Sequence, residues 1–373
     1  MSALPALPSA LKRRRILGWM GAAACPAIAR AAEATPAEPM AAASAPSPAS
    51  PALDVAALRQ GYAKRLKALL ADGHLPYIDI ESSCHSQKLD LDDIAKALDN
   101  RHIGLMALSA DIGHGQYERG VRYDPLNQRL LAAYPDRFIP VGNGGQGPCL
   151  NEDPTGFVAA QEAAARQGQL LLLGEYEFHH YPSPRQVKRG EFEREAKLPI
   201  DGPTGHAVFG LASRTGLAFQ LHYELEDANF PPLEKMLTQY PKARVVWCHL
   251  AQIRYEERAP HYTADYVASL IQRFPQLSFD TAFGDAMSIY PASGQRQARV
   301  WSALGGLKDE WRDLIVAHPQ RFLSALDLGG DRLERIASYD SKHRHFLAQL
   351  PKPVQEQVAY RNAWRLMFGD EFA

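Results

Sequence analysis

Two histidines each close an apolar run in the middle of the chain. His222 ends a run that begins at Leu217, and His249 ends a run that begins at Arg244. Between these runs, residues 232–240 carry apolar positions at helical spacing. This order predicts a βαβ unit with two parallel strands that are buried on both faces. In a parallel barrel, both imidazoles would converge at the mouth, where such barrels place their chemistry.

A histidine after an apolar run can instead be a buried structural residue with a hydrogen-bonded ring. For a single histidine, that interpretation is the commoner one. His222 and His249, however, stand at equivalent places in consecutive units, and each is followed by a polar or turn-forming stretch. We therefore expect both at the exits of their strands and interpret them as functional.

From residue 53 onward, short apolar runs alternate with amphipathic segments. No Gly-x-Gly-x-x-Gly follows the first run, so a dinucleotide-binding fold is not favoured. The alternation predicts an α/β protein, a (β/α)8 TIM barrel over residues 53–373 with extra N- and C-terminal helices. The expected strands are 77–81, 103–109, 138–141, 170–175, 217–222, 244–249, 277–280 and 322–327, with an insertion at 178–199. The expected helices are 55–70, 92–100 (capped by Asp90), 126–134, 154–167, 205–215, 232–240, 262–273, 309–317, 333–350 and 354–368.

Residues 1–31 have the features of an export signal. Arg13 and Arg14 precede an apolar stretch at 18–28 that is too short to span a bilayer. The pair resembles a twin-arginine signal, which implies a periplasmic protein. Changing both arginines to lysine should then keep the protein in the cytoplasm, as cell fractionation would show. Lipid anchoring at Cys25 is not expected, because no Leu stands three places before it. Residues 32–52 are almost wholly Ala, Pro, Ser, Glu and Thr, which predicts a disordered linker.

Charge and cysteine content exclude some classes of protein. The chain has 41 Lys and Arg against 42 Asp and Glu, and without residues 1–31 the balance is 36 against 42. This mild acidity gives no support for nucleic-acid binding. No membrane span is expected, and the expected partner is a small-molecule substrate. The oligomeric state stays open. Cys248 should be buried facing away from His249, whereas Cys84 and Cys149 could pair in an oxidising compartment.

Acidic residues close two further runs. Glu175, His222, His249 and Asp327 end the fourth, fifth, sixth and eighth expected strands. This arrangement is similar to the metal-site layout of the amidohydrolase superfamily. Segments 134–138, 318–323 and 358–366 resemble segments of its amidohydrolase-related (type 2) branch. The resemblance covers most of the globular chain and implies a barrel enzyme with a divalent metal ion.

The first expected strand departs from that family pattern. The family strand normally ends in Asp-x-His-x-His. Here Asp79 is kept, while Glu81 and Ser83 occupy the two histidine positions. Some decarboxylases of the superfamily carry a Glu at the first of these positions, so Glu81 could be a ligand. His85 shares a face with both residues on an extended chain and could substitute for a ligand only if the strand reaches it.

The remaining residues make chemical sense without the first-strand histidines. Two imidazoles and one carboxylate form a catalytic zinc arrangement with an open fourth position, and Glu175, His222 and His249 could supply it. Some deacetylases of the superfamily look similar. Asp327 would then be the general base for a water activated by one divalent ion, zinc in the first place. The structural alternatives are a salt bridge for Glu175 and a helix cap for Asp327.

Three further residues are candidates for binding substrate at the mouth. Arg122 follows the second expected strand, and His180 and Arg185 follow the fourth. An arginine there could clamp a carboxylate through two hydrogen bonds, although a solvated surface role is common for such residues.

The pattern favours hydrolysis of an amide, ester or lactone. Two alternatives remain. One is metal-assisted decarboxylation of a small carboxylic acid, with Glu81 as a ligand and His249 as an acid or base. The other is an inactive barrel that only binds a ligand.

Overall fold

The computed structural model describes residues 51–86, 89–192, 194–329 and 332–373. The expected export signal and nearly all of the expected linker lie outside these residues. In the described part of the chain, no helix is both long and apolar enough to cross a membrane.

Eight parallel strands of the described chain form a closed ring. They are β1 (Ile78–Cys84), β2 (Leu105–Ala110), β3 (Phe138–Ile139), β4 (Glu175–His180), β6 (Phe219–Tyr223), β7 (Val245–Trp247), β8 (Leu277–Asp280) and β11 (Phe322–Leu323). Hydrogen-bonded ladders join β1 to β2 and β2 to β3, and a second set of ladders joins β4, β6, β7, β8 and β11 in that order. Two bridges close the circle: Val141 pairs with Leu172 between β3 and β4, and Ser82 pairs with Leu328 between β1 and the segment after β11. The predicted (β/α)8 barrel is therefore confirmed.

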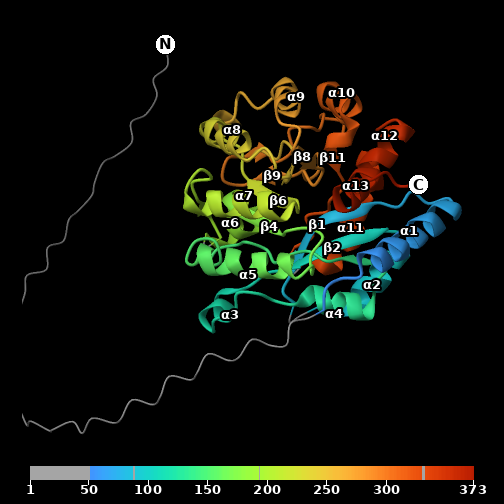
Figure 1. The fold of residues 1–373 in the computed structure, drawn as a ribbon. Coiled ribbons are helices and arrows are strands. Elements are labelled where there is room, and N and C mark those ends of the chain that lie inside the picture. Colours follow the sequence, from blue (N-terminus) through green and yellow to red (C-terminus); the bar gives the residue numbers. More distant parts are fainter. Residues whose placement is uncertain (1–50, 87–88, 193, 330–331) are drawn as a thin grey trace, which may run out of the picture. The chain divides into compact units, whose positions relative to one another are not determined.

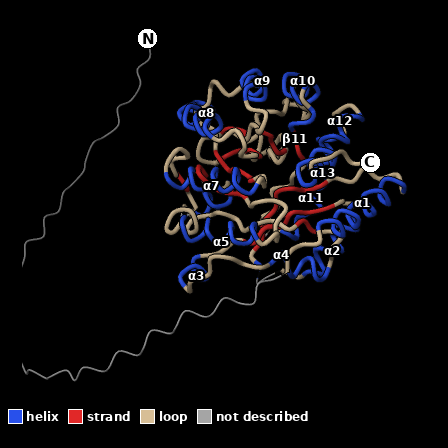
Figure 2. Tube along the Cα trace, viewed as in Figure 1, coloured by secondary structure: helices blue, strands red, loops and turns tan. Residues whose placement is uncertain are grey.

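Helices surround the strands, as Figures 1 and 2 show. Asp90 caps α2 with its carboxylate, as predicted, by accepting hydrogen bonds from the N–H groups of Asp92 and Asp93 at 3.0 Å. The helices are α1 (Val55–Ala71), α2 (Leu91–Asn100), α3 (His114–Glu118), α4 (Leu126–Ala133), α5 (Pro154–Arg166), α6 (Pro184–Arg189), α7 (Pro203–Thr215), α8 (Phe230–Gln239), α9 (Ala264–Arg273), α10 (Asp309–Ala317), α11 (Ile336–Leu347), α12 (Lys352–Glu356) and α13 (Asn362–Phe368). Three short strands, β5 (Ala196–Lys197), β9 (Ile289–Tyr290) and β10 (Gln295–Arg296), lie outside the barrel ring.

Several strand ends differ from the prediction, and three of these differences concern residues of the expected site. Glu175 opens β4 and does not close it, so the strand occupies part of the expected insertion. The strand before His249 ends at Trp247, and the strand before Asp327 ends at Leu323. Residues 170–174 are buried but form only an isolated bridge. An apolar run in the sequence indicates that the segment is buried. Burial alone does not show whether the segment is a hydrogen-bonded strand or an extended connection.

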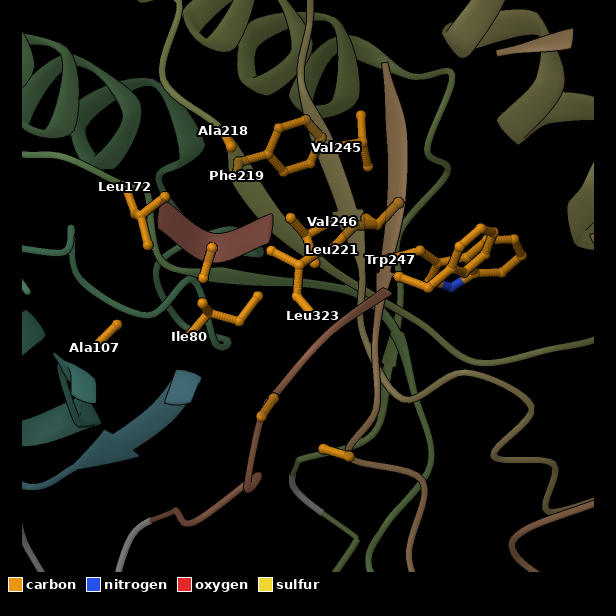
Figure 3. Packing of buried hydrophobic residues seen from close by; sticks show 14 of the residues in the cluster. Ile80, Ala107, Leu172, Ala218, Phe219, Leu221, Val245, Val246, Trp247 and Leu323 are labelled. Carbon is orange, nitrogen blue, oxygen red and sulfur yellow. The ribbon is translucent and has the colours of Figure 1, made fainter. Parts of the chain in front are cut away.

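Buried apolar side chains pack on both faces of the barrel strands, and Figure 3 shows Ile80, Leu221, Trp247 and Leu323 among them. Leu221 pairs in register with Trp247, so both side chains lie on the same face of the sheet. The Trp247 ring packs there against Tyr262, with a centroid distance of 5.8 Å. This apolar packing holds in place the strands that carry the polar residues of the site.

Truncation of Leu221 should destabilise the barrel. This side chain is fully buried, so Leu221→Ala leaves a cavity and should lower the free energy of unfolding by about 2–5 kcal/mol. The matched control is Leu304→Ala, because Leu304 is 99% exposed and should change stability by less than about 0.5 kcal/mol. Urea unfolding measures both variants. Equal midpoints would show that Leu221 does not support the core.

The three cysteines of the described chain are free and buried. The pairing of Cys84 with Cys149, left open from the sequence, is not formed. Cys248 is buried, as expected, but the expected orientation is wrong, because its thiol lies beside the carboxylate of Asp280 on the side of the triad.

Candidate active site

Three side chains from neighbouring strands and one following loop meet at a single place in the barrel. Oε1 of Glu175 lies 2.8 Å from Nδ1 of His222 and 3.1 Å from Nε2 of His249. The two histidine nitrogens are 3.1 Å apart. Glu175 comes from the start of β4, His222 from β6 and His249 from the loop after β7. The structure thus brings together the three residues expected from the sequence, and we call them the triad.

The second nitrogen of each triad histidine is also held. Nε2 of His222 lies 3.3 Å from Oε1 of Glu224, and Nδ1 of His249 lies 3.1 Å from the carbonyl oxygen of Ala282. Each ring can donate an N–H to its outer acceptor and direct the other nitrogen at Glu175. Histidines that bind metals are usually oriented in this way, by a carboxylate or a backbone carbonyl on the far nitrogen.

The charges of the triad stabilise one another. Burial alone would lower the pKa of His222, but the carboxylates of Glu175 and Glu224 raise it to about 10. Burial likewise opposes ionisation of His249, and Asp327, Glu175 and Asp280 outweigh this and raise its pKa to about 9. Burial would raise the pKa of Glu175, yet the two histidines hold it well below its usual range. The raised pKa values of both imidazoles mean that a cation competes with protons for the nitrogens that face Glu175.

The triad fits a divalent cation. Ligand atoms of a tetrahedral zinc ion with bonds of 2.0–2.1 Å stand about 3.3 Å apart. The three donor atoms of the triad are 2.8, 3.1 and 3.1 Å apart, so only a small opening would admit an ion. Two imidazoles and one carboxylate are also the ligand types that zinc accepts at a catalytic site.

The residues of the first strand take up different roles. A bulge between Asp79 and Ser82 interrupts the register of β1, so simple alternation does not place its side chains. Oγ of Ser83 donates to Asp111 at 3.0 Å, and His85 is exposed beyond the end of the strand. Glu81 remains in the barrel, where its donor atom lies within 4.8 Å of those of His249 and Asp280.

The acids Glu81 and Asp280 are incompletely paired. Both are buried, and among the described residues nothing pairs with Oε2 of Glu81 or Oδ2 of Asp280. Burial raises the pKa of each, and the neighbouring carboxylates Glu175 and Asp327 raise that of Glu81 further. Glu81 is therefore a second place where a cation or a proton would relieve an unfavourable arrangement.

Asp327 lies at the rim of this site. Its Oδ1 is 3.2 Å from a guanidinium nitrogen of Arg332, and its side chain is 33% exposed. Its backbone N–H donates to the carbonyl oxygen of Glu81 at 3.1 Å. Both Asp327 and His249 have left-handed backbones, with φ of 50° and 60°. For residues other than glycine this conformation costs about 1–3 kcal/mol, and it recurs at functional sites, where the fold holds side chains in unusual directions.

The three expected substrate-binding residues are placed differently from one another. His180 is buried, and its ring centroid lies 4.7 Å from that of His222. Arg122 is tied to structure: its Nε donates to Asp153 at 2.9 Å and its guanidinium covers the ring of Tyr117 at 3.7 Å. Arg185 is exposed on α6. These contacts give Arg122 a structural role, because they hold its loop against Asp153 at the start of α5.

Sequence reasoning missed a buried ion pair behind the triad. Glu224 bonds to His222 and also accepts from Arg254, whose guanidinium nitrogen is 3.1 Å away. Glu224, His222 and His180 also form a second group with converging donor atoms. A signal for Glu224 existed, because it stands two places after His222 and so shares its side of an extended chain. Arg254 follows no periodic pattern and had no such signal.

Removing the charge of Glu224 should weaken metal binding. Glu224→Gln keeps the size of the side chain but weakens the hold on Nε2 of His222, and loss of such an outer partner typically lowers metal affinity 10–100-fold. The control is Glu226→Gln, an acid two residues later that pairs with Arg258 at 3.0 Å and should not change affinity. Competition with a chromophoric chelator measures both. Equal affinities in the two variants would contradict an orienting role for Glu224.

We compared the chain with known protein families, curated sequences and solved structures, and only the solved structures show a similarity. No protein-family model matches the sequence, and no curated protein sequence matches it. Solved structures with a similar fold include 2,6-dihydroxybenzoate decarboxylase from Rhizobium (TM-score 0.48, 12% identity, 78% of this chain and 98% of that chain). They also include 4-oxalomesaconate hydratase from Rhodopseudomonas palustris (TM-score 0.46, 14% identity, 83% and 91%). A third is amidohydrolase 2 from Bifidobacterium longum subsp. infantis (TM-score 0.43, 12% identity, 78% and 98%). At these identities the assignment of the barrel rests on the strand pairing of this chain itself.

Proposed function

We propose that this chain is an enzyme of the amidohydrolase-related branch that hydrolyses an amide, ester or lactone with the help of one divalent ion, zinc in the first place. The observation that carries the proposal is the triad, in which both histidines have their outer nitrogens held and their inner nitrogens facing Glu175. An ion bound there would supply a Lewis acid that activates water and polarises a carbonyl.

The residues of the chain divide the remaining tasks. Glu175, His222 and His249 would hold the ion, and Glu224 and the Ala282 carbonyl keep the two rings in position. Asp327 is the proposed general base: a carboxylate oxygen takes a proton from the attacking water and returns it to the leaving group. An ion pair with Arg332, at 3.2 Å, holds the Asp327 side chain at the rim of the site.

Decarboxylation of a small carboxylic acid is the second candidate, and Glu81 is the observation that favours it. A carboxylate oxygen of Glu81 approaches His249 and Asp280, and Oε2 of Glu81 has no partner among the described residues. The ligand set expected for that reaction, Glu81 with His222 and Asp327, is not among the converging donor groups of the described chain. The triad is one of these converging donor groups, and we therefore rank hydrolysis above decarboxylation.

A substrate panel separates the candidates. The purified protein is incubated with amides, esters and lactones while acid release is followed, and with aromatic and unsaturated acids while carbon dioxide is followed. Acid release that depends on added zinc supports the proposed hydrolase. Carbon dioxide release without hydrolysis would replace it by the decarboxylase, and binding without turnover would leave an inactive barrel.

A further inference from the structure

The carboxylate of Asp280 is bonded to main-chain groups on both sides of it. Asp280 ends β8 and is fully buried. Its Oδ1 accepts one hydrogen bond from the N–H of His249 at 2.8 Å and another from the N–H of Ala282 at 3.0 Å. This one oxygen therefore ties the loop after β7, which carries His249, to the loop after β8, which carries Ala282.

His249 and Ala282 meet a second time through the imidazole. Nδ1 of His249 lies 3.1 Å from the carbonyl oxygen of Ala282. The contacts thus form a closed circuit, from Oδ1 of Asp280 to the main chain of His249, along its side chain to Ala282, and back to Oδ1. Because the main chain and the far nitrogen of His249 are both held, the ring has little freedom to turn, and its Nε2 faces Glu175 at 3.1 Å.

The main chain of His249 requires such support. Its φ is 60°, in the left-handed region, and a residue with a side chain keeps this conformation only where the surrounding structure holds it. β7 ends at Trp247, so His249 lies two residues beyond the last residue of the strand. A carboxylate is a stronger acceptor for a main-chain N–H than a neutral oxygen, and Asp280 is therefore suited to hold the turn.

We propose that Asp280 is a positioning residue for the triad, which acts through the main chain of His249. Its Oδ1 holds the left-handed turn and, with the Ala282 carbonyl, directs Nε2 of His249 at the place of the ion. The benefit for metal binding rests on the proposed function. The hold on the turn does not, because each contact of the circuit lies within the protein itself.

The competing role for Asp280 is that of a metal ligand. Donor atoms of Glu81, His249 and Asp280 lie within 4.8 Å of one another. Oδ1 of Asp280 already accepts two N–H groups and is 3.9 Å from Nδ1 of His249, the nitrogen that Ala282 holds. Oδ2 has no partner among the described residues and is the oxygen left for an ion, so a test has to separate the two roles.

The zinc affinity of three variants, measured by competition with a chromophoric chelator, separates them. Asp280→Ala removes the acceptor and should lower the affinity about 10–100-fold, the usual loss for an outer partner of a ligand, whereas Asp280→Asn keeps an oxygen for both N–H groups and should lose less than about tenfold. The control is Asp340→Ala, because Asp340 is a buried acid on α11 that bonds to Tyr77 at 3.1 Å and Arg344 at 2.8 Å, and its loss should leave zinc affinity unchanged.

Two results of this titration would overturn the proposal. Equal losses in Asp280→Ala and Asp280→Asn would make Asp280 a ligand, and unchanged affinity in Asp280→Ala would leave it without a role in positioning. If Asp280→Ala does not fold, Asp280→Asn decides: wild-type affinity supports the proposal, and a folded protein with affinity lowered tenfold or more overturns it.

Hydrogen exchange of the metal-free, full-length protein distinguishes this inference from the proposed function. Mass spectrometry of peptides that contain His249 should show faster amide exchange in Asp280→Ala than in the wild type, and no change in Asp280→Asn or Asp340→Ala. A protein that binds no zinc but shows this pattern would not be the proposed metal-dependent hydrolase, yet Asp280 would still hold the turn. Unchanged exchange in Asp280→Ala would overturn the inference whatever the zinc affinity.

Discussion

Replacing His222 by alanine should abolish both metal binding and activity. His222 is one of three protein donors in the triad, and two donors are too few to hold a catalytic zinc ion. Its removal also leaves Glu175 without the partner at 2.8 Å that stabilises its buried charge. Metal analysis of the purified variant and turnover on the responsive substrate should both fall to background.

The control for this variant is His345→Ala. His345 lies on α11 and its ring faces the carbonyl oxygen of Gly305 at 3.1 Å, outside the triad. This variant should keep its metal and its activity. A His222→Ala protein that is folded by circular dichroism and still carries a full equivalent of metal would remove His222 from the ligand set.

Asp327→Asn should separate chemistry from metal binding. Asparagine keeps the size and can still accept a hydrogen bond from Arg332, but it cannot take a proton from water. The metal should therefore stay while turnover falls about 10²–10⁴-fold, the usual contribution of a general acid or base. Turnover and metal content are measured on the same preparation.

Asp313→Asn is the matched control for Asp327→Asn. Asp313 lies on α10 and pairs at the surface with Arg312 at 3.0 Å, so its loss should leave turnover unchanged. Full activity in Asp327→Asn would leave the hydrolase without its base. Loss of metal in that variant would instead make Asp327 a ligand, as the decarboxylase alternative requires.

The barrel could be predicted from the sequence because its signals are local. Each expected strand is an apolar run, each expected helix has an amphipathic period, and capping by Asp90 follows from its position before such a period. The ends of strands were less predictable. Glu175 closes an apolar run and yet opens β4, because pairing with the neighbouring strand, which fixes where a strand begins, is not written in the run itself.

The candidate site was predictable to the extent that it follows strand order. His222 and His249 end consecutive runs, and parallel strands bring such residues to one mouth. Arg122 has a guanidinium group suited to binding a carboxylate and was expected near the mouth, but this group donates a hydrogen bond to Asp153. Arg254 pairs with Glu224 from an irregular loop after β7, where no periodicity relates sequence position to direction. Its placement depends on tertiary packing that a single sequence does not display.

The most direct test of the metal site is the metal content of the protein as purified, followed by titration of the stripped protein with zinc. We expect close to one equivalent of a divalent ion in the wild type, recovered on titration, and none in Glu175→Gln, because Glu175 is the carboxylate on which both histidine nitrogens converge. A wild-type protein that neither carries nor rebinds an ion, or a Glu175→Gln protein that binds one as tightly, would contradict a metal centre on the triad.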